Sequence, residues 1–285
     1  RGSTKSQIFQ KKRDMSSVAF AQNYESKWVG AATGALVNIN KLIECRNLLS
    51  TEYEAKDVEE YYIGVDVARS QSTANNQSSV AVGRVIRNPK TNKVKHIEIV
   101  NAINISNTMN FTNQVIVDGN GLGSGLVDQL LKNAEDPVTG EDLGCWNTIN
   151  TDNEPETNEC ENILFDMKAQ SYQSKVVSYF IDAVDSGKLR LLQQRKDSDF
   201  SQTEKDDYEN QVLPFIQTDF MFEEIANLKL KTLPSGAITV EKAVSKMNKD
   251  RFSCLSYLIF YIMEFENNFV ESVNEMDLLE EYTYL

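Results

Sequence analysis

Three aspartates stand in or beside apolar segments of this sequence. Asp66 lies inside the apolar run at 61–70, Asp118 closes a second apolar run, and Asp250 comes just before a third. Successive aspartates are 52 and 132 positions apart. Only a fold could bring these three carboxylates together, and the chemistry open to them depends on that assembly.

Carboxylates that share a site repel one another and raise each other's pKa. Divalent ions remove this penalty, and Mg²⁺ and Mn²⁺ suit oxygen ligands. Two such ions about 3.5–4 Å apart can activate a water molecule and stabilise the 3′ oxygen that leaves a phosphodiester. This chemistry needs no histidine, and His96 is the chain's single histidine. We therefore take Asp66, Asp118 and Asp250 as candidate catalytic residues and metal ligands.

Each aspartate also has a structural interpretation when it is considered alone. Asp66 and Asp118 could each cap a loop at a strand end, and an acid at Asp250 suits a helix N-terminus electrostatically. The order of the three is more specific. An acid in the first long strand, a hairpin, an acid closing the fourth strand and an acid opening a late buried helix follow the order in which RNase H-like nucleases assemble their carboxylates.

The run at 61–70 is rich in β-branched and aromatic residues, which is typical of a strand buried on both faces. Side chains alternate across a strand, so Tyr62, Gly64, Asp66 and Ala68 share one face. Two neighbours of Asp66 on this face are very small. We expect the space beside the carboxylate to admit a metal ion and a phosphodiester.

A glycine-rich stretch at 119–125 follows one predicted strand and opens a helix, as a phosphate-binding loop does. It is not a complete GxGxxG fingerprint, and the chain contains no Walker GxxxxGK[ST] sequence. We therefore favour a tight turn beside Asp118 that lets a substrate backbone approach, rather than a nucleotide-binding loop.

The 285-residue chain has a formal net charge of −13. Taken alone, this charge argues against binding of nucleic acid, because phosphates are bound by Lys and Arg. The charge is uneven, however: residues 1–13 carry five basic side chains and no acid, and residues 264–285 carry seven acids and no base. The net charge alone therefore does not rule out a local basic surface. Lys249 and Arg251 are candidates either for contact with a DNA backbone or for solvated surface residues.

The four cysteines (Cys45, Cys145, Cys160 and Cys254) are widely scattered and form no CxxC pair. This spacing and the scarcity of histidine speak against a zinc site, and we expect reduced thiols in an intracellular protein. No apolar run reaches membrane-spanning length, and the basic N-terminus is not a signal peptide. We therefore expect no contact with a membrane.

Hydrophobic periodicity predicts an α/β fold. Strands are expected at 61–70, 78–86, 94–103, 114–118, 188–192 and 237–240, helices at 35–49, 126–131, 163–186, 213–231 and 251–265, and a long acidic loop at 136–161. A turn at 88–92 makes the second and third strands a hairpin. A fourth strand parallel to the first would need a crossover, for which 104–113 is short and carries no helical pattern.

At these residues the sequence resembles the C-terminal nuclease domain of tailed-bacteriophage large terminase subunits. The matching stretches are YYIGVDVARS, VIVDGNGLGSGLVDQLL and KDRFSCLSYLIFYI, with FAQNYESKWVG upstream, and they span most of residues 15–265. The resemblance implies an RNase H-like mixed sheet, with an antiparallel hairpin plus parallel strands, flanked by helices. It also implies that the metal-binding acids fall at Asp66, Asp118 and Asp250.

The same resemblance implies a division of the chain and a function. Residues 1–57 would be the tail of an ATPase domain and a linker, 58–268 the nuclease domain, and 269–285 an acidic C-terminal tail. The activity would be that of a metal-dependent endodeoxyribonuclease with two Mg²⁺ or Mn²⁺ ions, which cuts concatemeric viral DNA during genome packaging in the host cell cytoplasm. The implied partners are double-stranded DNA, the small terminase subunit, the portal of the procapsid and the ATPase domain.

Two alternatives remain open at this point. The chain could be another RNase H-like nuclease of the resolvase or integrase type, against which the FAQNYESKWVG stretch and the long insert between Asp136 and Lys242 argue. It could also be a non-catalytic docking module that binds other packaging proteins through its acidic segments. Some terminase nucleases have a histidine three residues before the third acid, where this chain has Met247.

Overall fold

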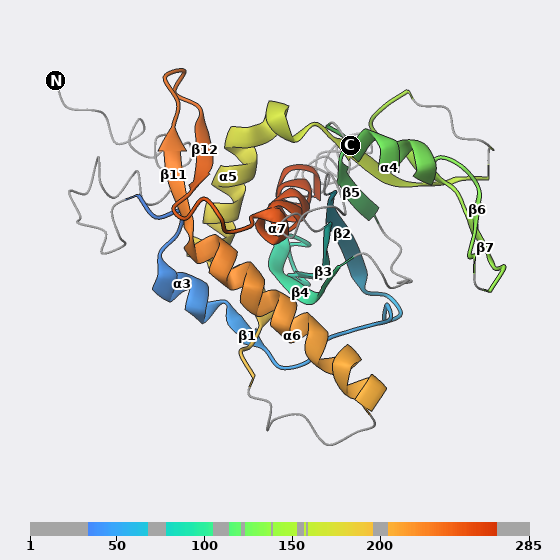
Figure 1. Cartoon of the computed structure of the whole chain (residues 1–285), viewed down its shortest axis with the longest axis horizontal. Coiled ribbons are helices and arrows are strands. Elements are labelled where there is room, and N and C mark those ends of the chain that lie inside the picture. Colours follow the sequence, from blue (N-terminus) through green and yellow to red (C-terminus); the bar gives the residue numbers. More distant parts are fainter. Residues whose placement is uncertain are drawn as a thin grey trace, which may run out of the picture.

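The computed structural model in Figure 1 describes most of the chain between residues 34 and 266. The described residues are 34–67, 78–104, 114–120, 123–137, 139–152, 157, 159–195 and 205–266. Ala68, the stretch at 105–113 where a crossover was expected, and the predicted tails up to residue 33 and from residue 267 lie outside these ranges.

Within the described ranges, eight strands form a mixed sheet in the order β1-β10-β4-β3-β2-β5-β9-β8. On one side of β2, the hairpin partners β3 and β4 pair antiparallel; on the other side, β5 and β9 follow in parallel. This arrangement confirms the predicted mixed sheet with an antiparallel hairpin plus parallel strands. The strands are β1 (Arg46–Leu48), β2 (Glu60–Asp66), β3 (Ser79–Arg87), β4 (Val94–Asn104), β5 (Gln114–Asp118), β8 (Trp146–Thr148), β9 (Glu161–Met167) and β10 (Leu189–Leu192).

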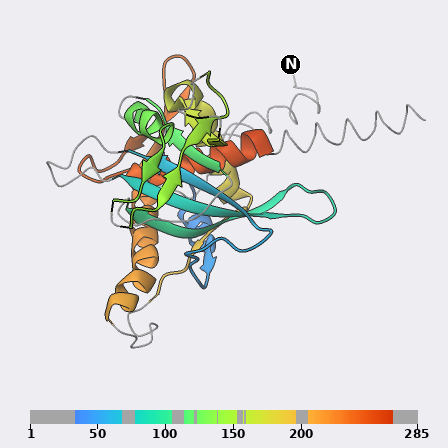
Figure 2. The ribbon, with the colours of Figure 1, turned by 90° about the vertical axis from the view of Figure 1, so that its right-hand side faces the viewer.

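Helices cover both faces of the sheet. The helices are α3 (Ile39–Glu44), α4 (Gly123–Leu130), α5 (Ala169–Asp185), α6 (Lys205–Ala226) and α7 (Asp250–Tyr261), and α7 continues as a π-helical turn (Ile262–Glu266). The main core joins the side chains of α5 and α7 to one face of the sheet, where Tyr62 lies, and α4 packs against Val65 and Val117 on the other face. Figure 2 shows the β3–β4 hairpin reaching beyond the rest of the described fold.

Two small hairpins complete the described fold. They are formed by β6 (Ala134–Glu135) with β7 (Asp142–Gly144), and by β11 (Leu228–Thr232) with β12 (Ile238–Lys242). Among the helices of the described residues, none is long and apolar enough to cross a membrane.

Helix α7 fills the space that was expected to be free beside Asp66. A Cβ atom built on Gly64 would lie 2.2 Å from the carbonyl oxygen of Cys254 and 2.9 Å from Cβ of Leu258. The glycine therefore lets the backbone of α7 approach the central strand, and it does not leave room for a ligand. The prediction of free space at this position was wrong, although the close helix also brings its first residue, Asp250, toward the strand end.

Four predicted elements differ from the structure. The helix expected at 35–49 is the shorter helix α3, and the residues that follow it form strand β1 (Arg46–Leu48). The helix expected at 163–186 divides into strand β9 and helix α5, because a short apolar run such as Ile163–Met167 cannot be told from a buried helix by periodicity alone. The helix expected at 213–231 ends at Ala226, and β11 follows it. The acidic stretch at 136–161 contains β7 and β8 instead of a continuous loop.

Residues before the predicted boundary at 57 belong to the same core as the rest of the fold. Leu36, Leu42 and Cys45 are buried with side chains of α5 and α7, and β1 pairs parallel with β10. The predicted boundary therefore does not separate two cores, since the strand and the helix before it complete the sheet and its cover.

Glu52 attaches the following segment to the sheet. Its Oε2 accepts a hydrogen bond from the Tyr61 hydroxyl at 2.7 Å, and its Oε1 lies 2.9 Å from Nη1 of Arg84. The side-chain amide of Asn101 donates to the Glu52 carbonyl oxygen at 2.7 Å. The acidic stretch after residue 50 is thus bound to β2, β3 and β4 at this point.

A disulfide joins Cys145 and Cys160, at the starts of β8 and β9. The expectation that all four cysteines are reduced thiols was therefore wrong. Cys45 and Cys254 are free and buried, and burial raises the pKa of the Cys45 thiol to about 11. These two thiols are protonated side chains of the core and are poor candidates for nucleophiles.

Candidate active site

Asp66 is the last residue of β2 and faces the first turns of α7. Burial raises the pKa of its carboxyl to about 7, with further contributions from the negative charges of Asp250 and Asp118. A hydrogen bond from Ser253 and the positive charge of Lys249 act in the opposite direction. The carboxyl is therefore a partly buried acid among other acids, which is the environment of many functional carboxylates.

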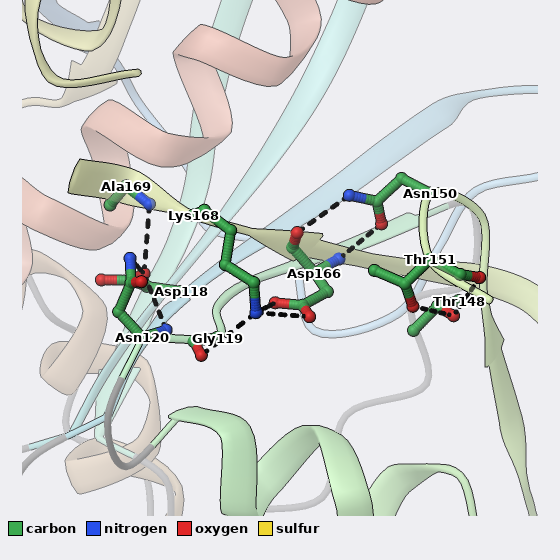
Figure 3. Close-up of polar contacts among 9 residues, drawn as sticks. All are labelled: Asp118, Gly119, Asn120, Thr148, Asn150, Thr151, Asp166, Lys168 and Ala169. Carbon is green, nitrogen blue, oxygen red and sulfur yellow. Dashed lines mark hydrogen bonds and ion pairs between the residues drawn. The ribbon is translucent and has the colours of Figure 1, made fainter. Parts of the chain in front are cut away.

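Asp118 is the last residue of β5, and its two carboxylate oxygens are held by different elements; Figure 3 shows its contacts with Asn120 and Ala169. Oδ1 accepts hydrogen bonds from the side-chain amide of Asn120 at 2.7 Å, the backbone N–H of Asn120 at 3.2 Å and the backbone N–H of Ala169 at 3.3 Å. Oδ2 accepts from the hydroxyl of Tyr257 at 3.4 Å. Since Ala169 is the first residue of α5, Asp118 satisfies one of the backbone N–H groups that a helix N-terminus leaves without a partner in the helix.

Asp250 is the first residue of α7. It follows the N-cap residue Lys249, which makes no side-chain cap, so Asp250 occupies the first turn and not the capping position. Its charge raises the pKa of both Asp66 and Glu224. An acid in this turn suits the helix dipole, so that interpretation of Asp250 remains compatible with the structure.

The topology brings the three aspartates to one region. Parallel strands β2 and β5 are neighbours and end at the same edge of the sheet, where α7 begins. The charges of Asp118 and Asp250 both act on Asp66. Among the residues that the structure describes, however, no three His, Cys, Asp or Glu side chains stand close enough to form a ready-made metal-binding group. The acids are thus neighbours without being a preassembled ligand set.

Helix α7 contributes two hydroxyl groups that sequence reasoning missed. Ser253 is hydrogen-bonded to Asp66 and to Tyr257, and the hydroxyl of Tyr257 bonds Asp118. Burial raises the pKa of the Tyr257 phenol above its usual range, and the charges of Asp66 and Asp118 add to this effect. The signal was present in the sequence: with Asp250, these residues form an i, i+3, i+7 polar stripe in a largely apolar helix.

An ion pair lies beside the end of β5 (Figure 3). The Nζ atom of Lys168 donates to both carboxylate oxygens of Asp166, at 2.9 and 2.7 Å, and to the carbonyl oxygen of Gly119 at 3.3 Å. A Cβ atom at position 119 would lie 1.7 Å from Oδ1 of Asp166. The glycine thus makes room for a protein carboxylate, which differs from the substrate approach expected from the sequence.

Asn150 fixes the strand that carries this ion pair. Its side-chain amide donates to the carbonyl oxygen of Asp166 at 2.8 Å, and its Oδ1 accepts from the Asp166 N–H at 2.9 Å (Figure 3). These two bonds continue the pairing of β8 with β9 beyond the end of β8. The position of Asp166 is therefore set by backbone contacts as well as by its partner Lys168.

Arg251 lies in the interior and not on a surface that DNA could reach. Its Nε donates to Oε1 of Gln217 at 2.8 Å, and its Nη1 donates to Oε1 of Glu224 at 2.8 Å. Only 10% of its side chain is exposed. This burial contradicts both interpretations of Arg251 from the sequence, contact with a DNA backbone and a solvated surface residue. Lys249, in contrast, is exposed.

In comparisons with known proteins, no family model and no curated protein matched this sequence. Among solved structures, the chain is similar to the large terminase nuclease of thermophilic phage G20c with bound magnesium, at 12% identity, with a TM-score of 0.44 over 80% of this chain and 97% of that chain. It is similar to the large terminase nuclease domain of Thermus phage P74-26 at 11% identity, with a TM-score of 0.42 over 79% and 93%. A K428A mutant nuclease domain from bacterial virus Sf6, with manganese, gives 13% identity and a TM-score of 0.34 over 79% and 98%.

Proposed function

We propose that this chain is a metal-dependent DNA endonuclease of a viral genome-packaging terminase. The observation that supports this proposal best is the mutual interaction of Asp66, Asp118 and Asp250, which come from β2, β5 and α7. A partly buried carboxyl beside two further carboxylates is costly, and a divalent cation would offset that cost. The donor set consists of hard oxygen atoms, which fits Mg²⁺ or Mn²⁺.

In this proposal the three aspartates hold the metal. Two bound ions would supply a nucleophilic water and stabilise the leaving 3′ oxygen. Asn120 and the backbone N–H of Ala169 keep Oδ1 of Asp118 oriented. Such hydrogen bonds set the direction of a ligand carboxylate and leave its other oxygen toward the shared region.

The substrate in this proposal is double-stranded DNA. Since the chain carries a net charge of −13, DNA would need local cations near the acids. Lys249 is exposed, and its charge acts on Asp66, so it is the proposed phosphate contact on this side. The small terminase subunit, the portal of the procapsid and an ATPase domain are the proposed partners, and cutting of concatemers in the host cytoplasm is the proposed setting.

Plasmid cleavage tests the function. Supercoiled plasmid is incubated with the protein in Mn²⁺, in Mg²⁺ or in EDTA, beside Asp66→Ala, Asp118→Ala and Asp250→Ala. The matched control is Asp182→Ala, which removes an exposed aspartate of α5. We expect metal-dependent nicking by the wild type and the control, and a loss of at least about 100-fold in the three variants.

Two results would reject this function. Cleavage that survives in all three aspartate variants would mean a different site or a contaminating nuclease. An absence of cleavage and of metal binding in the wild type would favour the docking module instead. A docking module would also keep its protein partners when any of the three aspartates is replaced.

A further inference from the structure

Two hydroxyl groups one turn apart on α7 connect two of the candidate ligands. Ser253 and Tyr257 are four residues apart, so their side chains lie on the same face of the helix. Ser253 is hydrogen-bonded to Asp66 and to Tyr257, and the Tyr257 hydroxyl lies 3.4 Å from Oδ2 of Asp118. The contacts therefore run from Asp66 through both hydroxyls to Asp118, across the ends of β2 and β5.

The two hydroxyls have too few protons for the three hydrogen bonds that link Asp66, Ser253, Tyr257 and Asp118. A serine and a tyrosine each supply one hydroxyl proton, and an ionised carboxylate supplies none. With Asp66 and Asp118 both ionised, one of the three contacts has no proton. Ser253 is 4% exposed, so water has little access to compensate it. A cation bound by the carboxylates would compensate the contact that lacks a proton.

The two hydroxyls belong to a helix that is largely buried in the core, so they are not part of an exposed polar surface. The positions that follow Ser253 on α7 include Leu255, Leu258 and Ile259, each 0% exposed in the core. A polar stripe in such a helix costs free energy unless its groups are hydrogen-bonded. Among the described residues, the hydroxyls meet that requirement through the two aspartates and each other.

We infer that Ser253 and Tyr257 are positioning residues, which hold the carboxylates of Asp66 and Asp118 in the orientation that binds a divalent cation. This inference rests on the proposed function, because it assigns these residues to the same metal site. Hydrogen bonds to ligand carboxylates fix their direction, and their loss commonly weakens metal binding by about 10- to 100-fold. Neither residue touches the substrate in this role, since each acts through an aspartate.

The test measures Mn²⁺ binding without DNA. Mn²⁺ is titrated into the metal-free full chain by calorimetry for the wild type, Tyr257→Phe and Ser253→Ala. Ser253→Thr keeps the hydroxyl and should restore affinity. The matched controls are Tyr179→Phe, which loses a hydroxyl bonded to Glu264 instead, and Ser256→Ala, which loses a buried hydroxyl on the same helix that bonds the Ser253 carbonyl oxygen.

We expect about 10-fold weaker Mn²⁺ binding in Tyr257→Phe and Ser253→Ala, and affinities near that of the wild type in both controls and in Ser253→Thr. Melting temperatures of the metal-free variants show whether each has folded. If a serine variant does not fold, the Mn²⁺ affinity of Tyr257→Phe, which only removes an oxygen atom, is the test of the inference. Wild-type affinity in Tyr257→Phe, with binding abolished in Asp66→Ala, would overturn this inference and leave the nuclease function standing. A wild type that binds no Mn²⁺ would overturn both.

Discussion

Glu224 of α6 caps the first turn of α7 through its contacts with Arg251. Its Oε2 accepts a hydrogen bond from the backbone N–H of Arg251 at 2.9 Å, and its Oε1 accepts from Nη1 of the same residue at 2.8 Å. The N–H of Phe252 also donates to Oε2, at 3.2 Å. The helix N-terminus is therefore satisfied by a glutamate of another helix, while the charge of Asp250 acts on Asp66.

Replacing Glu224 with Ala is expected to destabilise the fold strongly. The change removes a cap and leaves the guanidinium of Arg251, whose side chain is 10% exposed, without its ion-pair partner. Breaking a buried pair in this way costs about 3–5 kcal/mol. Urea unfolding measures the loss. The matched control is the exposed neighbour Glu223→Ala, for which we expect less than about 0.5 kcal/mol. Equal losses in the two variants would contradict the capping role.

In the metal-free protein, Asp66 is expected to lower the stability of the fold at neutral pH. Burial, with nearby negative charge, raises its pKa from 3.8 to about 7. The folded state therefore holds a proton that the unfolded chain has already released. The proton held by Asp66 stabilises the folded state fully below about pH 4, and this stabilisation is lost as the pH rises through about 7. A pKa difference of this size corresponds to at most about 4 kcal/mol.

Asp66→Asn removes that dependence on pH. In EDTA at pH 8 we expect the variant to be more stable than the wild type, by up to about 4 kcal/mol, and at pH 4 we expect the two to be alike. Asp182→Asn, at an exposed site, serves as the control. The measurement is the free energy of urea unfolding at each pH. A variant that is less stable than the wild type at pH 8 would show that Asp66 has a supporting role in the metal-free fold.

Strands β2, β3, β4, β5 and β10 could be predicted from the sequence, because each is an apolar run, and Asp66 and Asp118 stand at the ends of two of them. Strand β9 could not be predicted, because the periodicity of a short apolar run does not distinguish a strand from a buried helix. The pairing of Glu224 with Arg251 could not be predicted either, because it joins residues of two helices whose packing no local pattern records. The same holds for the ion pair of Asp166 with Lys168.

The close approach of α7 to β2 predicts the effect of a side chain at Gly64. A Cβ at this position would lie 2.2 Å from the Cys254 carbonyl oxygen, so Gly64→Ala should push the helix away from the strand. We expect a loss of about 1–3 kcal/mol or more, together with weaker Mn²⁺ binding, because Asp250 moves with α7. Gly125→Ala is the control, since a Cβ there meets nothing within 4 Å in helix α4. That variant should be as stable as the wild type or more stable, by up to about 1 kcal/mol. Wild-type stability in Gly64→Ala would mean that α7 can shift at no cost.

Lys168 is expected to stabilise the end of β5 through Asp166. Its Nζ bonds both Asp166 oxygens and the Gly119 carbonyl oxygen, at 2.9, 2.7 and 3.3 Å, and the Asp166 side chain is only 7% exposed. Lys168→Met removes the cation and leaves a carboxylate with little access to water, which should cost about 1–3 kcal/mol in urea unfolding. Lys175→Met, which breaks an ion pair of a lysine that is 57% exposed on α5, should cost less than about 1 kcal/mol.

Coupling between Lys168 and Asp166 separates an ion pair from two independent effects. If the lysine acts through the buried carboxylate, Asp166→Asn should remove most of the cost of Lys168→Met, because the neutral amide no longer needs a cation. The double variant should then be more stable than the sum of the single losses predicts, by about 0.5–3 kcal/mol. If the losses of unfolding free energy are additive, Lys168 acts only through its contact with the carbonyl oxygen of Gly119. In that case, the loop after Asp118 would be held by the contact with the Gly119 carbonyl oxygen, and Asp166→Asn by itself would leave Mn²⁺ affinity unchanged.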